Sequence, residues 1–140
     1  MVKTRILLVD DSEQWRLSVR LILERTAWFQ VVGEACDGVE GVTQATALLP
    51  DVVLLDIGMP RLNGIEAAKK IRQACPESKI IFLTQEHDSD VRKAALDTGG
   101  VAYLLKSHAH ELKTTIQTAM LTVLQTARAR LLVSEESSSA

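Results

Sequence analysis

The chain has 140 residues, of which 46% are hydrophobic and 24% are charged. This length suits one domain with a buried core, and the composition argues against global disorder. Sixteen Lys and Arg residues against eighteen Asp and Glu residues leave a net charge of −2, which offers no bulk attraction to nucleic acid or to an acidic membrane. The apolar run at residues 6–9 is too short for a signal peptide or a membrane span. Cys36 and Cys75 lack paired or metal-type spacing, so we expect reduced, semi-buried thiols in a soluble cytoplasmic protein.

Five short apolar runs recur along the chain, and each is followed by a longer segment with helical periodicity. The predicted strands cover residues 4–9, 30–35, 51–55, 79–83 and 101–105. The predicted helices cover residues 12–26, 38–49, 63–74, 88–98 and 109–132. The strand centres are continuously apolar, which is typical of strands covered on both faces. Strands that alternate with helices predict an α/β domain with a parallel sheet.

Polar residues follow four of these strands, at the edge of the sheet where open α/β folds bind ligands. They are Asp10 and Asp11 after the first strand, Asp56 after the third, Thr84 after the fourth and Lys106 after the fifth. Taken singly, Asp11 suits a helix N-cap, Thr84 a strand end and Lys106 a solvated charge. Their conjunction at one edge of one sheet favours a functional site.

This set of side chains suits the transfer of a phosphoryl group. Clustered carboxylates repel one another unless a cation offsets them, and oxygen ligands without thiols select a hard ion such as Mg²⁺. A lysine and a threonine at the same edge offer a cation and a hydrogen-bond donor to phosphoryl oxygens. An aspartate beside Mg²⁺ can act as a nucleophile toward phosphorus and form an aspartyl phosphate.

Five motifs carry these residues. They are Leu8-Val9-Asp10-Asp11, Asp37-Gly38-Val39-Glu40, Leu55-Asp56-Ile57-Gly58-Met59-Pro60 with Gly64, Phe82-Leu83-Thr84 and Tyr103-Leu104-Leu105-Lys106. In order, spacing and residue type they resemble the receiver domain of two-component response regulators, from residue 6 to about residue 123. The resemblance implies a flavodoxin-like receiver fold, which is a doubly wound five-stranded parallel sheet in the order 2-1-3-4-5.

The resemblance also implies how the phosphoryl group is received. Asp56 would accept it from the phosphohistidine of a sensor histidine kinase or of a phosphotransfer protein. Asp10, Asp11 and Asp56 would hold Mg²⁺ together with the backbone carbonyl of Gly58. The chain would then be a phosphoacceptor switch and not a turnover enzyme.

Three further residues would respond to the phosphoryl group. Lys106 would pair with the acyl phosphate, and Thr84 would form a hydrogen bond with it. Tyr103 would be the switch aromatic, which moves inward as Thr84 shifts toward the phosphate. In physical terms, the new charge would bias a surface that has two arrangements.

The sequence departs from the usual receiver pattern at three places. Gln85 replaces a small residue, Gly100-Val101-Ala102 replaces the frequent approach to the aromatic, and Ser107 replaces a proline. Gln85 would alter phosphoryl access or lifetime, and it is the main support for one alternative, a degenerate receiver that ignores phosphate. A second alternative, a phosphatase with an aspartyl nucleophile, would need a substrate pocket or a cap domain for which 140 residues leave no obvious room.

The first predicted helix has apolar residues on two sides. The stripe expected in the core consists of Trp15, Val19, Ile22 and Leu23. Leu17 and Leu21 fall on the opposite side, one turn apart, beside the acidic residues. We hypothesise that these two leucines help to dock the histidine kinase or a phosphotransfer helix.

The last predicted helix is longer than the sheet requires. Residues 109–132 would span about 36 Å as a helix, against about 17 Å for a five-residue strand. Its end suits either a frayed linker, or a signalling helix that leads to an output domain or pairs in a homodimer. We expect a receiver domain in residues 1–125 and a helix extension with a Ser/Glu-rich tail in residues 126–140. Gly64-Ile65-Glu66-Ala67-Ala68 and Ser107 resemble receivers attached to helix-turn-helix domains, so transcription would be regulated by a DNA-binding domain outside this chain.

Overall fold

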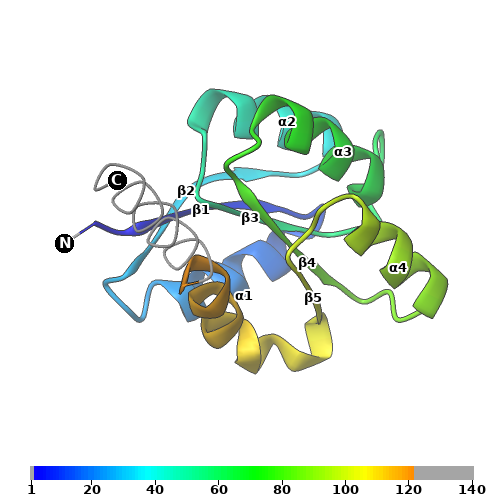
Figure 1. Cartoon of the computed structure of the whole chain (residues 1–140). Coiled ribbons are helices and arrows are strands. Elements are labelled where there is room, and N and C mark those ends of the chain that lie inside the picture. Colours follow the sequence, from blue (N-terminus) through cyan, green and yellow to red (C-terminus); the bar gives the residue numbers. More distant parts are fainter. Residues whose placement is uncertain (1, 122–140) are drawn as a thin grey trace, which may run out of the picture.

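The continuous apolar runs form one parallel sheet with the strand order β2-β1-β3-β4-β5 (Figure 1). The computed structural model describes residues 2–121. Its strands are β1 (Thr4–Val9), β2 (Phe29–Ala35), β3 (Val52–Leu55), β4 (Lys79–Thr84) and β5 (Ala102–Leu105). All the pairings between neighbours are parallel. The predicted doubly wound topology is therefore confirmed, and every strand begins and ends within about one residue of its predicted bounds.

Four α-helices connect the strands. They are α1 (Glu13–Leu23), α2 (Gly38–Leu48), α3 (Gly64–Ala74) and α4 (Ser89–Asp97). Each begins after a polar N-cap whose side-chain oxygen accepts a hydrogen bond from a backbone N–H of the first turn. The N-caps are Ser12, Asp37, Asn63 and Asp88. Among the described residues, no helix is long and apolar enough to cross a bilayer.

The chain after β5 differs from the sequence prediction of an α-helix from residue 109. It first forms a 3₁₀-helix, η1 (Lys106–Glu111), and the C-terminal α-helix starts at residue 112 and reaches residue 121, where the description ends. His108 in η1 has non-helical angles, with φ −112° and ψ 27°. No residue of η1 is buried, whereas Leu112 is fully buried, so the α-helix begins with its apolar stripe. The expected overhang and the tail at 126–140 lie outside the described residues.

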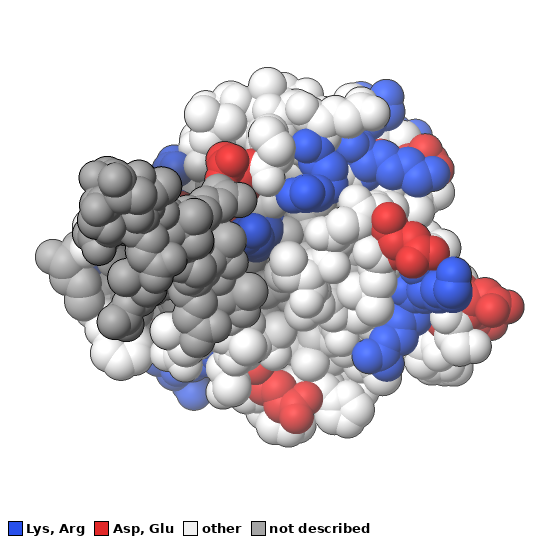
Figure 2. Space-filling model, viewed as in Figure 1, with Lys and Arg blue, Asp and Glu red and all other residues white. Residues whose placement is uncertain are grey.

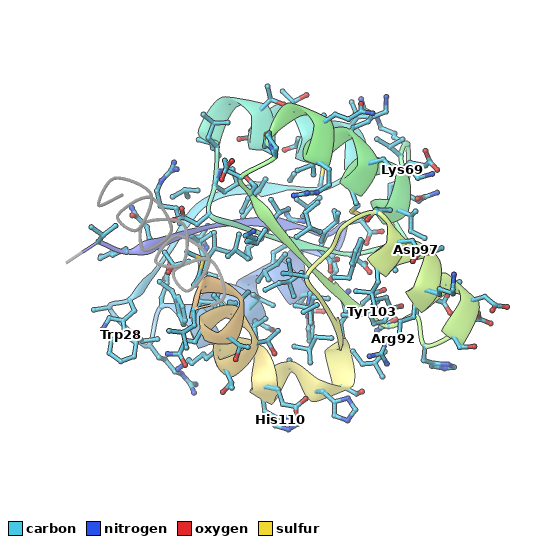
Figure 3. The ribbon with its side chains drawn as sticks, viewed as in Figure 1. Trp28, Lys69, Arg92, Asp97, Tyr103 and His110 are labelled. Atoms are coloured by element: carbon cyan, nitrogen blue, oxygen red, sulfur yellow. The ribbon has the colours of Figure 1, made fainter. Side chains whose placement is uncertain are left out.

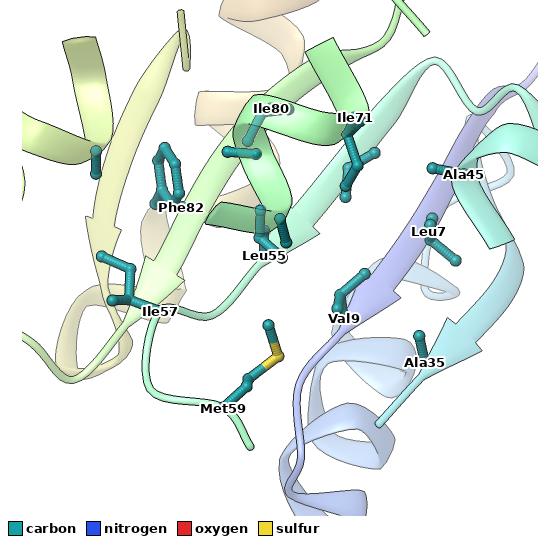
Figure 4. Packing of buried hydrophobic residues seen from close by; sticks show 14 of the residues in the cluster. Leu7, Val9, Ala35, Ala45, Leu55, Ile57, Met59, Ile71, Ile80 and Phe82 are labelled. Atoms are coloured by element: carbon teal, nitrogen blue, oxygen red, sulfur yellow. The ribbon is translucent and has the colours of Figure 1, made fainter. Parts of the chain in front are cut away.

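Alternate residues of the strands pack into two cores, one on each face of the sheet. On one face, α2, α3 and α4 cover the side chains of Leu7, Val9, Val53, Leu55, Ile80 and Phe82 (Figure 4). On the other face, α1 and the C-terminal helix cover those of Ile6, Leu8, Leu54, Ile81 and Leu83. Because both faces are buried, the polar groups that follow the strands gather at the ends of the sheet.

The two thiols differ from the expectation of semi-buried cysteines. Cys36 is exposed just after β2, and Cys75 is buried at the end of α3. The expectation was wrong because each cysteine borders a loop, where neighbouring residues differ widely in exposure. Both are free, as expected from their spacing.

We expect Gly64→Ala to lower the free energy of unfolding by about 2 kcal/mol. A Cβ added at Gly64 would lie 2.0 Å from the carbonyl oxygen of Asp56 and 2.7 Å from the Cα of Ile57, so the backbone after β3 has to shift. At Gly58 an added Cβ meets nothing within 4 Å, and Gly58→Ala is the matched control, with a change below about 0.5 kcal/mol. Urea denaturation measures both variants. Equal stability of the Gly64→Ala variant and the wild type would contradict this close contact.

Candidate phosphoacceptor and metal site

The carboxyl ends of two neighbouring strands bring three carboxylates together. Asp10 and Asp11 follow β1, and Asp56 follows β3, which pairs with β1. One oxygen of each carboxylate lies within 4.8 Å of the others. Asp10 and Asp56 are 4% and 7% exposed, whereas Asp11 is exposed. The three aspartates that the sequence places at strand ends therefore form one cluster, open to solvent on the side of Asp11.

Lys106 contacts two of these carboxylates from the end of β5. Its Nζ is 2.7 Å from Oδ2 of Asp10 and 3.4 Å from Oδ2 of Asp56. The lysine side chain is 10% exposed, so water and salt screen these ion pairs less than surface pairs. Three carboxylates still outnumber one ammonium group. The cluster therefore keeps an excess of negative charge, and its all-oxygen carboxylate set suits a hard divalent cation.

Asp10 is anchored through its side chain and through its backbone. Its Oδ1 accepts a hydrogen bond from the N–H of Ser12 at 2.9 Å, and its carbonyl oxygen accepts one from Nη1 of Arg16 at 2.6 Å. The Nε of Arg16 donates to Glu34 on β2 at 3.0 Å, and Arg20 donates to the same carboxylate. The roles of Arg16 and Glu34 were not predicted, because 18 residues separate this pair and no local pattern links them.

Asp56 borders a depression at the carboxyl end of the sheet. Its Oδ1 accepts the N–H of Ile57 at 2.8 Å, while its Oδ2 faces Lys106. Gly58 and Gln85 also line this depression, together with Asp11. Four of the residues that the resemblance assigns to the metal or to the phosphoryl group, Asp11, Asp56, Gly58 and Lys106, thus line one depression, whereas Asp10 and Thr84 are buried.

Thr84 and Tyr103 are linked through the backbone of one residue, Glu86, in the loop between β4 and α4. The hydroxyl oxygen of Thr84, which is buried, accepts the N–H of Glu86 at 3.2 Å. The hydroxyl of Tyr103 on β5 donates to the carbonyl oxygen of Glu86 at 2.5 Å. The Tyr103 ring lies beside Arg92 of α4, with 5.6 Å between the guanidinium and the ring centroid (Figure 3). Burial raises the pKa of Tyr103, which keeps its hydroxyl protonated as a donor.

The two leucines predicted to lie on the outer side of α1 are exposed. Leu17 and Leu21 are 55% and 56% exposed.

Trp15, which was predicted to lie in the core stripe of α1, contacts both the core and the site. It packs against the core beneath α1 but is only partly buried. Its ring also faces Lys106 and lines the depression at Asp56. The prediction that Trp15 belongs to the core is therefore incomplete, because the first turn of α1 starts at the site itself.

Positive and negative side chains are interspersed on the face of the molecule that Figure 2 shows. Nucleic-acid-binding surfaces instead gather Lys and Arg in a continuous patch or stripe. The coloured part of the face in Figure 2 shows no such continuous patch.

Comparison with known proteins now identifies the family, because residues 6–117 match the family model described as the response regulator receiver domain. The chain belongs to the response regulator receiver domain family. The sequence prediction of a receiver is thus confirmed.

Curated relatives of this receiver include proteins with different names and lengths. The chain is 42% identical over 116 residues to the transcriptional regulatory protein LiaR of Bacillus subtilis (strain 168), which covers 82% of this chain and 55% of LiaR. It is also 42% identical over 106 residues to protein-glutamate methylesterase/protein-glutamine glutaminase 1 of Geobacter sulfurreducens, which covers 75% of this chain and 29% of that protein. The chain thus spans about half or less of the length of these relatives.

Solved structures support the same fold. A two-component response regulator of the LuxR family from Aurantimonas sp. SI85-9A1 superimposes with a TM-score of 0.81 and 32% identity. The match covers 86% of each chain. It therefore supports the same fold over most of this chain.

We expect Asp10→Asn to raise the free energy of unfolding at neutral pH by about 1 kcal/mol in the absence of divalent ions. Burial is the largest cause that raises the pKa of Asp10, and the charge of Asp56 adds to it, against the hydrogen bonds from Lys106 and Ser12. A raised folded pKa means that ionised Asp10 costs stability as the pH rises through that pKa. The gain in the variant therefore vanishes as the pH falls toward 3.8, the ordinary value.

The matched control for this prediction is Asp11→Asn, because Asp11 is exposed in the same cluster. Urea denaturation in a chelator-treated buffer at several pH values compares the two variants. A loss of stability on Asp10→Asn at neutral pH would contradict the unfavourable environment of this carboxylate.

Proposed function

We propose that this receiver domain is a phosphorylation-dependent switch of a two-component system, in which Asp56 accepts a phosphoryl group in the presence of Mg²⁺. The carrying observation is the cluster of three carboxylates within 4.8 Å of one another, with Lys106 held between Asp10 and Asp56. The donor set consists of carboxylate oxygens with an excess of negative charge, which fits Mg²⁺. Asp10, Asp11 and Asp56 would hold the ion, with the backbone carbonyl of Gly58.

Transfer to Asp56 requires a nucleophilic oxygen and a way to offset charge. A carboxylate oxygen of Asp56 attacks phosphorus, the O–P bond forms as the P–N bond to the donor histidine breaks, and the imidazole keeps the electron pair of that bond. Bound Mg²⁺ supplies neutralisation of the charge that gathers between the carboxylate and phosphoryl oxygens. Lys106 already faces Oδ2 of Asp56, so it can pair with the added negative charge.

The proposed switch runs from Thr84 to Tyr103. A phosphoryl group on Asp56 offers new acceptors to the hydroxyl of Thr84, and rotation of that hydroxyl toward them releases the N–H of Glu86. Because Tyr103 donates to the carbonyl oxygen of the same residue, a shift of Glu86 repositions Tyr103. The surface formed by α4 and β5 would thereby report phosphorylation.

We further propose the setting in which this switch acts. The receiver domain would cover residues 1–125, act in the cytoplasm as a phosphoacceptor without turnover, and pair with a second copy in a homodimer. It would regulate transcription through a DNA-binding output domain outside this chain. The similarity to LiaR and to a LuxR-family regulator supports this output. The chain is equally identical to a protein-glutamate methylesterase, so an output domain other than a DNA-binding domain is the second candidate.

We expect acetyl phosphate with Mg²⁺ to add one phosphoryl group to the wild-type protein, and we expect no addition to Asp56→Asn. The amide of Asn lacks the nucleophilic carboxylate oxygen, whereas the site otherwise keeps its shape. Asp97→Asn is the matched control, because Asp97 is an exposed carboxylate of α4. Intact-protein mass spectrometry, with and without a chelator, reads the result. Equal labelling of the wild type and Asp56→Asn would contradict Asp56 as the acceptor.

We expect the double variant Leu17→Ser/Leu21→Ser to lose about tenfold in the rate of phosphorylation by a histidine kinase, through the loss of two apolar contacts. Its phosphorylation by acetyl phosphate stays at the wild-type rate, because neither leucine lines the site. Purified kinases are first profiled with the wild type to find an active donor. Leu49→Ser is the control, since Leu49 is 60% exposed and follows α2 at the opposite end of the sheet. An unchanged kinase rate in the double variant would reject the docking role.

A further inference from the structure

Trp15 lies against the lysine of the phosphoacceptor site. The Nζ of Lys106 is 5.1 Å from the centroid of the Trp15 ring, which is within the distance at which an aromatic face attracts a cation. The lysine side chain is 10% exposed, so water competes little for this ammonium group. Trp15 also lines the depression at Asp56, together with Gln85. The ring therefore borders both the lysine and the approach to the phosphoacceptor.

The first turn of α1 holds this ring in place. The backbone N–H of Trp15 donates to Oγ of Ser12, the N-cap, at 3.1 Å. The indole Nε1 is buried and has no hydrogen-bond partner among the described residues. A buried N–H without a partner costs stability, and a leucine or phenylalanine would avoid that cost. Packing alone thus does not account for a tryptophan here, whereas an indole offers the strongest aromatic face for a cation.

Lys106 needs such a contact because its ion pairs must change. Its ammonium is closer to Asp10, at 2.7 Å, than to Asp56, at 3.4 Å. In the proposed function, Asp10 becomes a metal ligand and the ammonium pairs with phosphoryl oxygens on Asp56. Lys106 then loses its shortest ion pair, while its contact with the ring is compatible with both arrangements.

We propose that Trp15 is a positioning residue that keeps the ammonium of Lys106 at the phosphoacceptor through its aromatic face. This role rests on the proposed function, since the lysine has to reach the phosphoryl group. Trp15 lies in the first turn of α1, the helix that follows Asp10 and Asp11 in the sequence.

Substitutions at Trp15 test this role. With acetyl phosphate and Mg²⁺, we expect Trp15→Leu to lower the phosphorylation rate about fivefold and Trp15→Phe about twofold, because the aromatic attraction is lost or weakened. Trp28→Phe is the matched control and keeps the wild-type rate. Trp28 is 56% exposed and lies far from Tyr103, the aromatic on the strand that leads to Lys106 (Figure 3). Wild-type rates in both Trp15 variants would overturn the proposal.

A double-mutant cycle separates positioning from a merely structural role. In the Lys106→Met background, Trp15→Leu should cause no further loss, because the ring no longer has an ammonium to hold. If the fivefold loss appears in this background as well, Trp15 acts independently of Lys106 and the proposal fails. Trp15→Leu also alters packing, so urea denaturation accompanies each rate, and Trp15→Phe provides the variant that keeps a ring.

Fluorescence tests the contact without phosphorylation. The sequence has two tryptophans, so Trp28→Phe leaves Trp15 as the emitter. In that background we expect Lys106→Met to shift the emission of Trp15, and Lys69→Met, at an exposed lysine of α3, to leave it unchanged. Identical emission in all three proteins would overturn the proposal even if the wild type is phosphorylated. An emission shift in a protein that acetyl phosphate and kinases fail to label would count against the proposed function alone.

Discussion

Burial of both faces of one parallel sheet is the constraint on which the rest of this receiver depends. Apolar side chains fill the two faces of β1, β3 and β4, so polar side chains of the strand segments gather where the strands end. Parallel direction then brings the ends of β1 and β3 to the same edge, with Asp10, Asp11 and Asp56 within 4.8 Å. Lys106 arrives there because β5 is parallel as well. The chemistry of the site is thus a consequence of topology.

The sequence was sufficient for what local pattern and topology determine. Apolar runs located the strands, and helical periodicity located α1, α2, α3 and α4 between them. The approach of Asp10, Asp56 and Lys106 followed from strand direction alone. The start of the last α-helix was misplaced, because helical periodicity does not distinguish the 3₁₀ turns of η1 from the α-helix that begins at Leu112.

Contacts between distant side chains were beyond reach of the sequence. The ion pair of Arg16 and Glu34 joins α1 to β2. The hydrogen bonds of Thr84 and Tyr103 meet at the backbone of Glu86. Each depends on a rotamer and on a loop path that no spacing rule describes. The strand ends place the reacting groups, but the side chains that steady or connect them are selected by packing in three dimensions.

The first helix, α1, turns one side to the site and another side to solvent. Residues two apart on a helix point to nearly opposite sides, so Trp15 faces Lys106 while Leu17 is exposed to solvent. Arg16, between them, holds the carbonyl oxygen of Asp10. In the proposed function, a partner that docks on the exposed side of α1 would contact the same turn that holds the carbonyl oxygen of Asp10 and borders Lys106. A small tilt of that turn would move both contacts together, so we expect partner binding to change the geometry of the proposed site.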